Sequence, residues 1–306
     1  MPDQKLFVIS LRCGRLANRL ILFANFIALA EEHGWGVSNV TFHSYAAFFK
    51  ATHRDIYCRY PVAERKSPLD LIPGVAATIR KTRIFNHAVR AASLWHARLL
   101  IFGKSAVTLR ESPGRNVLNL EGGQFQNQIR DARIVFVHGW KFRALDLVER
   151  HAEKIRNYFQ PLDEFEEPAA GVIAQLRREA DIVAGVHIRQ GDYRRWLGGR
   201  YFFPVTRYAA WMQELAAQFP GQRVSFFVCS DEPRNTEEFP GLSTAFGKSP
   251  VNDLCALAKC DYIVGPVSTF SQWASFYGQK PLLHLRGSGD KIDLEKFRVS
   301  NLDYVT

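Results

Sequence analysis

The chain has 306 residues, of which 47% are hydrophobic and 23% are charged, values close to the averages of globular proteins. This composition excludes a chain that is disordered, collagenous or coiled coil throughout, and the length predicts two domains. Lys and Arg total 40 against 30 Asp and Glu, so the formal net charge is +10 at pH 7, which favours anionic partners. The five cysteines form no CxxC pair and predict neither a zinc site nor a disulfide framework.

The apolar stretches of the chain are short. The run at residues 6–9 is too short for the core of a signal peptide. The longest stretch, residues 20–30, falls below the ~18 residues that a membrane span needs. We therefore expect a cytoplasmic protein whose thiols are reduced.

The first half of the chain opens with a strand–turn–helix pattern. Residues 6–11 are apolar, as in a buried strand, and Gly14 lies in the turn that follows. A helical pattern then covers residues 16–33 and ends at a glycine. This order is typical of a Rossmann-like unit. A second strand is predicted at residues 133–138, with a helical pattern after it up to about residue 158.

Residues 71–110 differ from the rest in charge, because they hold seven basic residues and no Asp or Glu. Apolar residues recur there at helical spacing between Ile84 and Leu99, which predicts a basic amphipathic helix. One interpretation is a solvated helix whose apolar side packs on the core. The other is a peripheral contact with an anionic membrane.

An acidic stretch at residues 160–168, bracketed by Pro161 and Pro168, marks the predicted domain boundary. We therefore expect one domain at residues 1–162 and another at 163–306. Strands and helices alternate in the second, which predicts a parallel sheet covered on both faces. The predicted helices are 165–180, 204–218, 251–260 and 269–277, and the predicted strands are 181–188, 223–230, 261–266 and 280–285.

Polar segments follow three of these predicted strands, at residues 187–193, 229–233 and 265–271. Ligands of parallel sheets bind at the carboxyl ends of the strands. If the sheet is parallel, the three segments therefore converge on one crevice.

Each segment carries a group that suits a nucleoside diphosphate. Arg189 offers a planar donor fork for phosphate oxygens. Asp231 offers acceptor oxygens for guanine or a ribose hydroxyl. Ser268 or Thr269 can cap the following helix, whose amino terminus favours an anion.

Several common signatures are absent from the sequence. It contains no Asp-x-Asp pair, no phosphate-binding loop of the GxxxxGK[ST] type, no HExxH and no GxSxG. These absences favour a site that binds its nucleotide without a metal, and we expect no metal and no other cofactor.

Ordinary interpretations remain open for every one of these residues. His187 can be an ordinary hydrogen-bonded histidine at the end of a strand. Arg189 and Asp192 can form a surface ion pair, Asp231 can belong to a plain turn, and Ser268 can be a plain helix cap. The prediction depends on the order of the segments and their place at strand ends.

Taken together, the segments resemble the fucosyltransferase superfamily, and most closely its bacterial α-1,2-fucosyltransferase-like branch (glycosyltransferase family 11-like enzymes). The matching segments run in family order over most of the chain. They are GRLANRL at 14–20, HGWKF at 138–142, HIRQGDY at 187–193, SDE at 230–232, DLCALAKC at 253–260 and VSTFSQWA at 267–274.

The resemblance implies an α/β protein of the GT-B class, with two Rossmann-like domains that face a cleft. It implies that the second domain binds GDP-β-L-fucose and that fucose passes to a glycan hydroxyl with inversion and without a metal. The acceptor would be a glycan or a lipid-linked glycan, as in bacterial surface-polysaccharide or glycolipid synthesis, and the enzyme would lie in the cytoplasm, with a possible site on the inner face of the cell membrane.

The resemblance also implies residue roles. Arg189 would hold the β-phosphate, and with Asp192 it is our candidate for catalysis. His187 and Asp231 would contact the guanine. The full set expected to bind the donor is Gly14, Asn18, His187, Arg189, Asp231, Ser268, Thr269 and Phe270.

Four positions depart from the family pattern. Gln190 replaces a second arginine, for which Arg194 or Arg195 is a candidate substitute, Ala17 replaces a glycine, Arg19 a glutamine and Gln272 a tryptophan. These departures leave open a different GDP-sugar as donor, or a glycan-binding protein without activity. A basic nucleic-acid-binding protein is a further alternative, although the sequence has none of the usual motifs and we expect no nucleic acid as partner.

Overall fold

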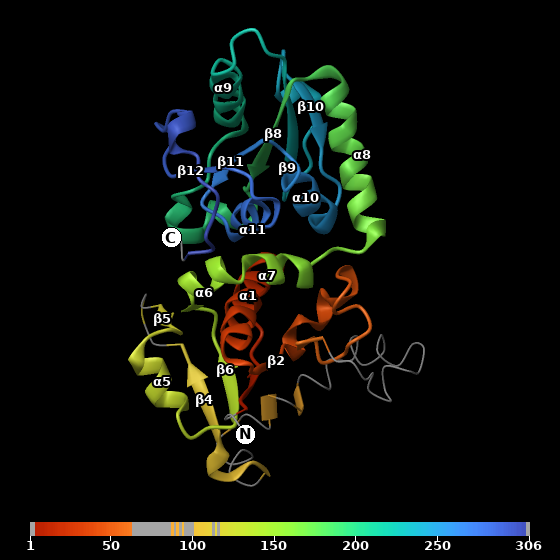
Figure 1. The fold of residues 1–306 in the computed structure, drawn as a ribbon. Helices are drawn as coiled ribbons and strands as arrows, with labels where there is room; N and C mark the ends of the chain where they lie inside the picture. The colour runs from red at the N-terminus through yellow and green to blue at the C-terminus, as the bar shows by residue number, and fades with distance from the viewer. Residues whose placement is uncertain are drawn as a thin grey trace. The chain divides into compact units, whose positions relative to one another are not determined.

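The computed structural model describes residues 4–62, 87–88, 90–91, 94, 101–111, 114 and 117–303. The chain divides into two compact units, Met1–Leu162 and Asp163–Thr306. Each unit holds a mostly or wholly parallel five-stranded sheet with helices beside it (Figure 1). The predicted α/β class is therefore confirmed.

The first unit begins with the predicted strand–turn–helix. Strand β1 (Leu6–Ile9) leads through a turn at Gly14 (φ +56°) into α1 (Leu16–His33), which ends at Gly34 in the left-handed conformation. Nearly all of α1 is buried, because it covers the sheet and contacts the later helices α6 and α7. The sheet order is β3-β2-β1-β6-β4, in which only β3 is antiparallel.

The remaining elements of this unit are mostly short. The predicted helix that ends at residue 158 is two helices, α6 and α7, separated at His151. The bounds are β2 (Gly36–Ser38), β3 (Arg59–Tyr60), β4 (Ala106–Arg110), β5 (Leu118–Asn119), α5 (Gly123–Ile129), β6 (Ile134–His138), β7 (Phe142–Arg143), α6 (Leu145–Arg150) and α7 (Ala152–Tyr158), with 3₁₀ turns at Val40–Ser44, Ala46–Phe48 and Gly103–Ser105.

The basic segment 71–110 lies largely outside the described residues, and so does most of its predicted amphipathic helix. Its last five residues form β4, which pairs with β6 in parallel register. The predicted helical spacing ends at Leu99, so this strand lies beyond it, and the sequence did not predict the strand. The sequence AVTLR pairs as a strand because its neighbour in the sheet, β6, offers an open edge.

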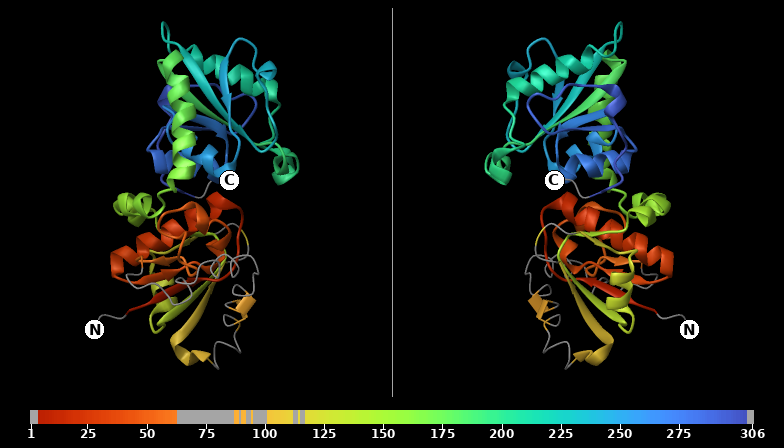
Figure 2. Two further views of the ribbon diagram at one scale, coloured as in Figure 1. Left: turned by 90° about the vertical axis from the view of Figure 1, so that its right-hand side faces the viewer. Right: turned by 90° about the vertical axis from the view of Figure 1, so that its left-hand side faces the viewer.

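The second unit alternates as predicted, and its sheet is wholly parallel with the order β10-β9-β8-β11-β12. Helix α9 covers one face, and α8, α10 and α11 cover the other (Figure 2). The predicted boundary stretch at residues 160–168 is partly helical: α8 begins at Asp163 and includes Pro168. The bounds are α8 (Asp163–Glu179), β8 (Ile182–Ile188), α9 (Val205–Ala216), β9 (Val224–Ser230), β10 (Ser243–Phe246), α10 (Pro250–Leu257), β11 (Tyr262–Pro266), α11 (Thr269–Gly278) and β12 (Leu282–Leu285).

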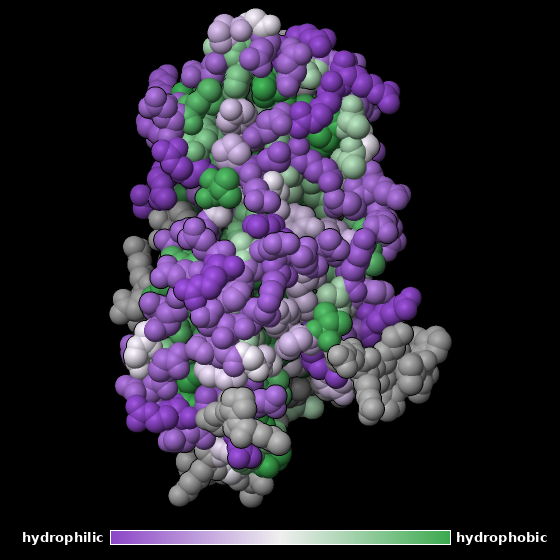
Figure 3. Space-filling model, in the orientation of Figure 1, coloured by the Kyte–Doolittle hydropathy of each residue, from purple (hydrophilic) through white to green (hydrophobic). Residues whose placement is uncertain are grey.

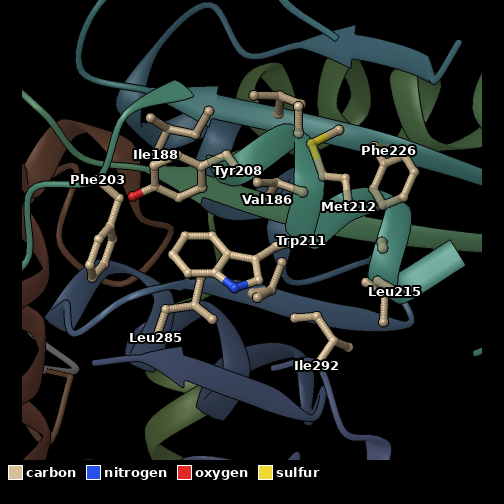
Figure 4. Packing of buried hydrophobic residues seen from close by; sticks show 14 of the residues in the cluster. Val186, Ile188, Phe203, Tyr208, Trp211, Met212, Leu215, Phe226, Leu285 and Ile292 are labelled. Carbon is tan, nitrogen blue, oxygen red and sulfur yellow. The ribbon is translucent and has the colours of Figure 1, made fainter. Parts of the chain in front are cut away.

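A core of aromatic and aliphatic side chains fixes α9 against this sheet (Figure 4). Trp211 and Tyr208 of α9 are 1% exposed, and the Trp211 indole donates a hydrogen bond to the carbonyl of Asp290 at 2.7 Å. Burying a side chain of this size contributes roughly 2–3 kcal/mol. The packing holds the strands in register, and so it fixes where the loops at their carboxyl ends lie.

On the face drawn in Figure 3, hydrophilic side chains predominate among the described residues and hydrophobic ones are scattered. In the parts of the chain that the structure describes, no helix combines the length and the apolar character that crossing a membrane requires.

Candidate functional site

The three polar segments of the second unit follow three neighbouring strands. β8 lies between β9 and β11, and His187 pairs with Cys229 in the β8–β9 register. Arg189, Asp231 and Ser268 therefore come directly after adjacent carboxyl ends, as the alternating pattern predicted. Gly14 and Asn18 lie in the first unit, after β1.

Side-chain contacts join the three segments. The Arg189 Nη1 atom lies 3.4 Å from Oδ2 of Asp231, which links the loops after β8 and β9. The Tyr193 hydroxyl donates to the carbonyl of Val267 at 2.7 Å, which links the loops after β8 and β11. These three loops therefore form one connected polar cluster.

Arg189 is the central cation of this cluster. Its Nη2 atom donates to Asp192 at 2.9 Å, and its guanidinium lies 5.6 Å from the centre of the Tyr193 ring. The Arg189 side chain is 16% exposed, whereas that of Asp192 is 50% exposed. The guanidinium is thus held in place from the protein side, and its most exposed partner is a carboxylate that an incoming anion can displace.

Asp231 holds the loop that carries Arg189. Its Oδ1 accepts from the amide of Gln190 at 2.8 Å, and its Oδ2 accepts from the amide of Gly191 at 3.0 Å. A Cβ atom at Gly191 would lie 2.8 Å from Oδ2, so this close approach requires glycine. Hydrogen bonds to an ionised acceptor are stronger than neutral ones, so Asp231 orders the loop.

His187 is buried at the end of β8, with its ring 5.0 Å from that of Phe270. Burial, with a smaller contribution from the nearby charge of Arg189, lowers the pKa of His187 to about 3. Its Nδ1 has no hydrogen-bond partner among the described residues. The imidazole is therefore neutral at physiological pH, with one ring nitrogen left to pair with another group.

His284, at the end of β12, is a site neighbour that the sequence did not single out. Burial, helped by the nearby charge of Arg286, lowers its pKa to about 4. The register of β11 and β12 places His284 opposite Gly265, just before the Ser268 segment. Only the sheet order reveals this, because nothing in the local sequence distinguishes a histidine inside an apolar strand.

Ser268 caps α11. Its hydroxyl accepts from the amide of Phe270 at 3.2 Å, and its carbonyl accepts from the Ser271 hydroxyl at 3.1 Å. The ordinary interpretation of Ser268 as a helix cap thus describes what the side chain does here. Thr269 and Phe270 begin the helix, so the first-turn amides, which favour anions, lie beside the cluster.

In the first unit, the turn that contains Gly14 is held by Arg19, which is 1% exposed. Its Nη1 donates to the Thr41 carbonyl and the Ser44 hydroxyl at 2.9 Å, and its Nη2 donates to the Gly14 carbonyl at 3.2 Å. The Cβ of an alanine at Gly14 would collide with Asn18. Arg19 therefore orders the loop after β1.

The structure also answers which arginine lies beside Gln190. It is Arg234, whose Nη2 is 2.9 Å from Oε1 of Gln190, and the sequence did not single it out. Arg194 instead pairs with Glu232 at 3.3 Å.

No grouping of three or more His, Cys, Asp or Glu side chains suited to a metal occurs within the described residues.

Comparison with known families identifies a match over much of the second unit. Residues 148–283 match the sequence profile of the family described as Glycosyl transferase family 11. The chain is similar to galactoside alpha-(1,2)-fucosyltransferase 1 of Homo sapiens, with 26% identity over 173 residues that cover 50% of this chain and 43% of the relative. The enzyme of the same description from Sus scrofa is 27% identical over 155 residues, covering 44% and 40%. The matches therefore span less than half the length of these relatives.

Two solved structures share the fold over nearly the whole chain. A mutant of Arabidopsis thaliana FUT1 in complex with GDP gives a TM-score of 0.55 at 12% identity, covering 96% of this chain and 74% of that one. Fucosyltransferase NodZ from Bradyrhizobium gives 0.53 at 14% identity, covering 94% and 98%. The shared fold is GT-B, the class that the resemblance implied.

Proposed function

We propose that this chain, a member of the fucosyltransferase superfamily, transfers L-fucose from GDP-β-L-fucose to a glycan hydroxyl, with inversion at the anomeric carbon and without a metal ion. The observation that carries the proposal is the cluster formed by Arg189, Asp231 and Ser268 at three adjacent strand ends. The match to Glycosyl transferase family 11 covers all three residues and supports it.

In the proposed donor complex, the β-phosphate replaces Asp192 as the main partner of Arg189. The first-turn amides of α11 face the same diphosphate and add their partial positive charge. The neutral His187 contacts the guanine edge through its buried Nδ1, while Asp231 keeps the loop ordered. The cluster thus binds the charged part of the donor with protein groups alone.

The proposed reaction is a displacement at the anomeric carbon. The acceptor hydroxyl forms the new C–O bond from the face opposite GDP, and the bond from carbon to the phosphate oxygen breaks. Its electron pair stays on GDP, and the proton of the hydroxyl is released. Because negative charge grows on the diphosphate as the bond breaks, Arg189 stabilises the transition state more than the bound donor.

A nucleotide panel tests the function. Calorimetry against GDP, UDP and ADP, each with and without a chelator, is expected to show binding of GDP that the chelator leaves unchanged. Incubation with GDP-fucose and galactoside acceptors is then expected to yield an α-fucoside, read by the anomeric signals in proton NMR. Preference for UDP, a metal requirement or a β-linked product would contradict the proposal.

We propose a glycan or lipid-linked glycan acceptor, as in the synthesis of bacterial surface polysaccharides or glycolipids, with the enzyme on the inner face of the cell membrane. The membrane location is supported by the basic composition of residues 71–110, because basic segments are attracted to anionic lipids. Sedimentation with anionic vesicles that weakens as salt rises would support this location. Equal partition with neutral vesicles would contradict it.

A further inference from the structure

Arg234 lies in the turn after β9 and folds back over it. Its side chain is only 9% exposed. Nε donates to the Ser230 hydroxyl at 3.3 Å, and Nη1 donates to Glu238 at 2.9 Å. Nη2 donates both to Glu232 and to Oε1 of Gln190, each at 2.9 Å. Two carboxylates hold the guanidinium, and its hydrogen bond to the loop after β8 goes to Gln190.

Gln190 is 4% exposed and uses both ends of its amide. Nε2 donates to the carbonyl of Phe203 at 2.9 Å, while Oε1 accepts from Arg234. The Gln190 backbone amide is in turn bound by Asp231, as is that of Gly191. Two residues of the turn after β9 thus hold the loop that carries Arg189. Asp231 binds the backbone amides of the loop, and Arg234 binds the side chain of Gln190.

We propose that Arg234 and Gln190 are a positioning pair, which sets the place of Arg189 without touching the donor. The proposal deepens the proposed function and rests on it for the identity of the ligand. The physical basis is that a charge-assisted hydrogen bond between two nearly buried groups is costly to break. Once it is broken, the Gln190 side chain loses its link to the turn after β9 and keeps its hydrogen bond to Phe203, so Arg189 samples a wider range of positions.

A double-mutant cycle tests the pairing. Gln190→Met, Arg234→Met and the double variant are compared by GDP dissociation constant, kcat and melting temperature. Each single variant is expected to raise the dissociation constant roughly tenfold, and the double variant about as much as one single variant, because both lose the same contact. If the increases in the dissociation constant from the two single variants multiply in the double variant, the proposal is overturned.

Arg177→Met is the matched control. Arg177 also pairs with a carboxylate next to a strand, that of Asp261 at 2.7 Å. Asp261, however, precedes β11, so it lies at the amino-terminal end of the strand and not at the carboxyl end, where the cluster lies. This variant is expected to lower the melting temperature while leaving the GDP dissociation constant and kcat unchanged. If it weakens GDP binding as much as Arg234→Met, general destabilisation explains the result and the pair has no positioning role.

Two further variants keep the test valid if the methionine variants fold poorly. Arg234→Lys retains the charge between the carboxylates but lacks the planar fork, so the protein is expected to fold and still to bind GDP more weakly. Gln190→Arg places two guanidinium groups face to face, and adding Arg234→Gln is expected to restore binding at least partly. A second substitution that gives no recovery would overturn the pairing.

A measurement without ligand separates this proposal from the proposed function. In the free protein, hydrogen exchange of the Gln190 and Gly191 amides is expected to be faster in Arg234→Met than in the wild type, and unchanged in Arg177→Met. If the wild type does not bind GDP, the proposed function fails while the exchange data still decide on the pair. Unchanged exchange in Arg234→Met would overturn it.

Discussion

The imidazole of His187 lies 5.0 Å from the ring of Phe270, so the end of β8 meets the first turn of α11. This contact removes the imidazole from water on the side of the helix. Burial then lowers the pKa of His187 to about 3, and that of His284 to about 4 on the neighbouring side of the cluster. Both histidines are therefore neutral in the folded protein at physiological pH.

The pH dependence of stability follows from these two pKa values. In the unfolded chain both histidines titrate near pH 6.5. At these two positions the unfolded state therefore binds up to about two more protons than the folded state between about pH 6 and 4. Their contribution to the free energy of unfolding falls as the pH falls, by roughly 1.4 kcal/mol per pH unit for each histidine. In His187→Gln, urea denaturation at several pH values is expected to give a slope that lacks the contribution of one histidine, roughly 1.4 kcal/mol per pH unit. An unchanged slope would contradict the prediction.

Arg189→Ala is expected to lower kcat by roughly two to three orders of magnitude, because in the proposed reaction it removes the main charge opposite the leaving diphosphate. Steady-state kinetics with GDP-fucose check this. Arg223→Ala is the control, since Arg223 is 67% exposed and pairs with Asp181 across 3.5 Å. That variant is expected to retain normal turnover. Near-normal turnover in Arg189→Ala would remove Arg189 from the mechanism.

Gly191→Ala is expected to weaken GDP binding by roughly tenfold, because its Cβ would lie 2.8 Å from the Asp231 carboxylate and push the Arg189 loop away. Calorimetry with GDP measures the effect. Gly171→Ala is the matched control: its Cβ would meet no atom within 4 Å, and a helical alanine there is expected to raise stability by up to about 1 kcal/mol. Equal GDP affinity in the two variants would show that the close approach is unimportant.

The alternation of strands and helices made the second unit predictable, because a parallel sheet needs apolar strands and helices that cover it. The position of Arg189, Asp231 and Ser268 at strand ends followed from the same pattern. Arg234 and His284 did not follow, because their role depends on how the β9 turn folds back and on which strand lies beside β11.

The first unit was less predictable from local sequence. β4 (Ala106–Arg110) has no strong alternation of its own and gains its strand structure by pairing with β6. In the second unit, β10 (Ser243–Phe246) is a short edge strand that the sequence did not predict either. Arg19 follows a glycine turn and would be expected in water. Its burial depends on carbonyls more than twenty residues away, such as that of Thr41.

Asp253→Asn is expected to stabilise the protein above pH 6. Burial raises the pKa of Asp253 to about 6, so this carboxyl is protonated more in the folded than in the unfolded state between about pH 4 and 6, and its own contribution to stability falls as the pH rises through this range. Oδ1 accepts from the amides of Lys248 and Ser249, a role that an asparagine oxygen can keep. The gain at pH 8 is expected to be roughly 1–3 kcal/mol by denaturation. A loss at pH 8 would contradict this prediction.

Substitutions of Ser268 separate its role as a cap from its role in binding an anion. Ser268→Asp keeps a good cap and is expected to preserve the melting temperature, yet it places a negative charge beside the proposed diphosphate and is expected to weaken GDP binding by more than about tenfold. Ser268→Asn keeps the cap without the charge, so both stability and binding are expected to be retained. Ser268→Ala loses the cap and about 1 kcal/mol of stability. If the aspartate variant binds GDP as well as the asparagine variant, the diphosphate does not lie at the amino terminus of α11.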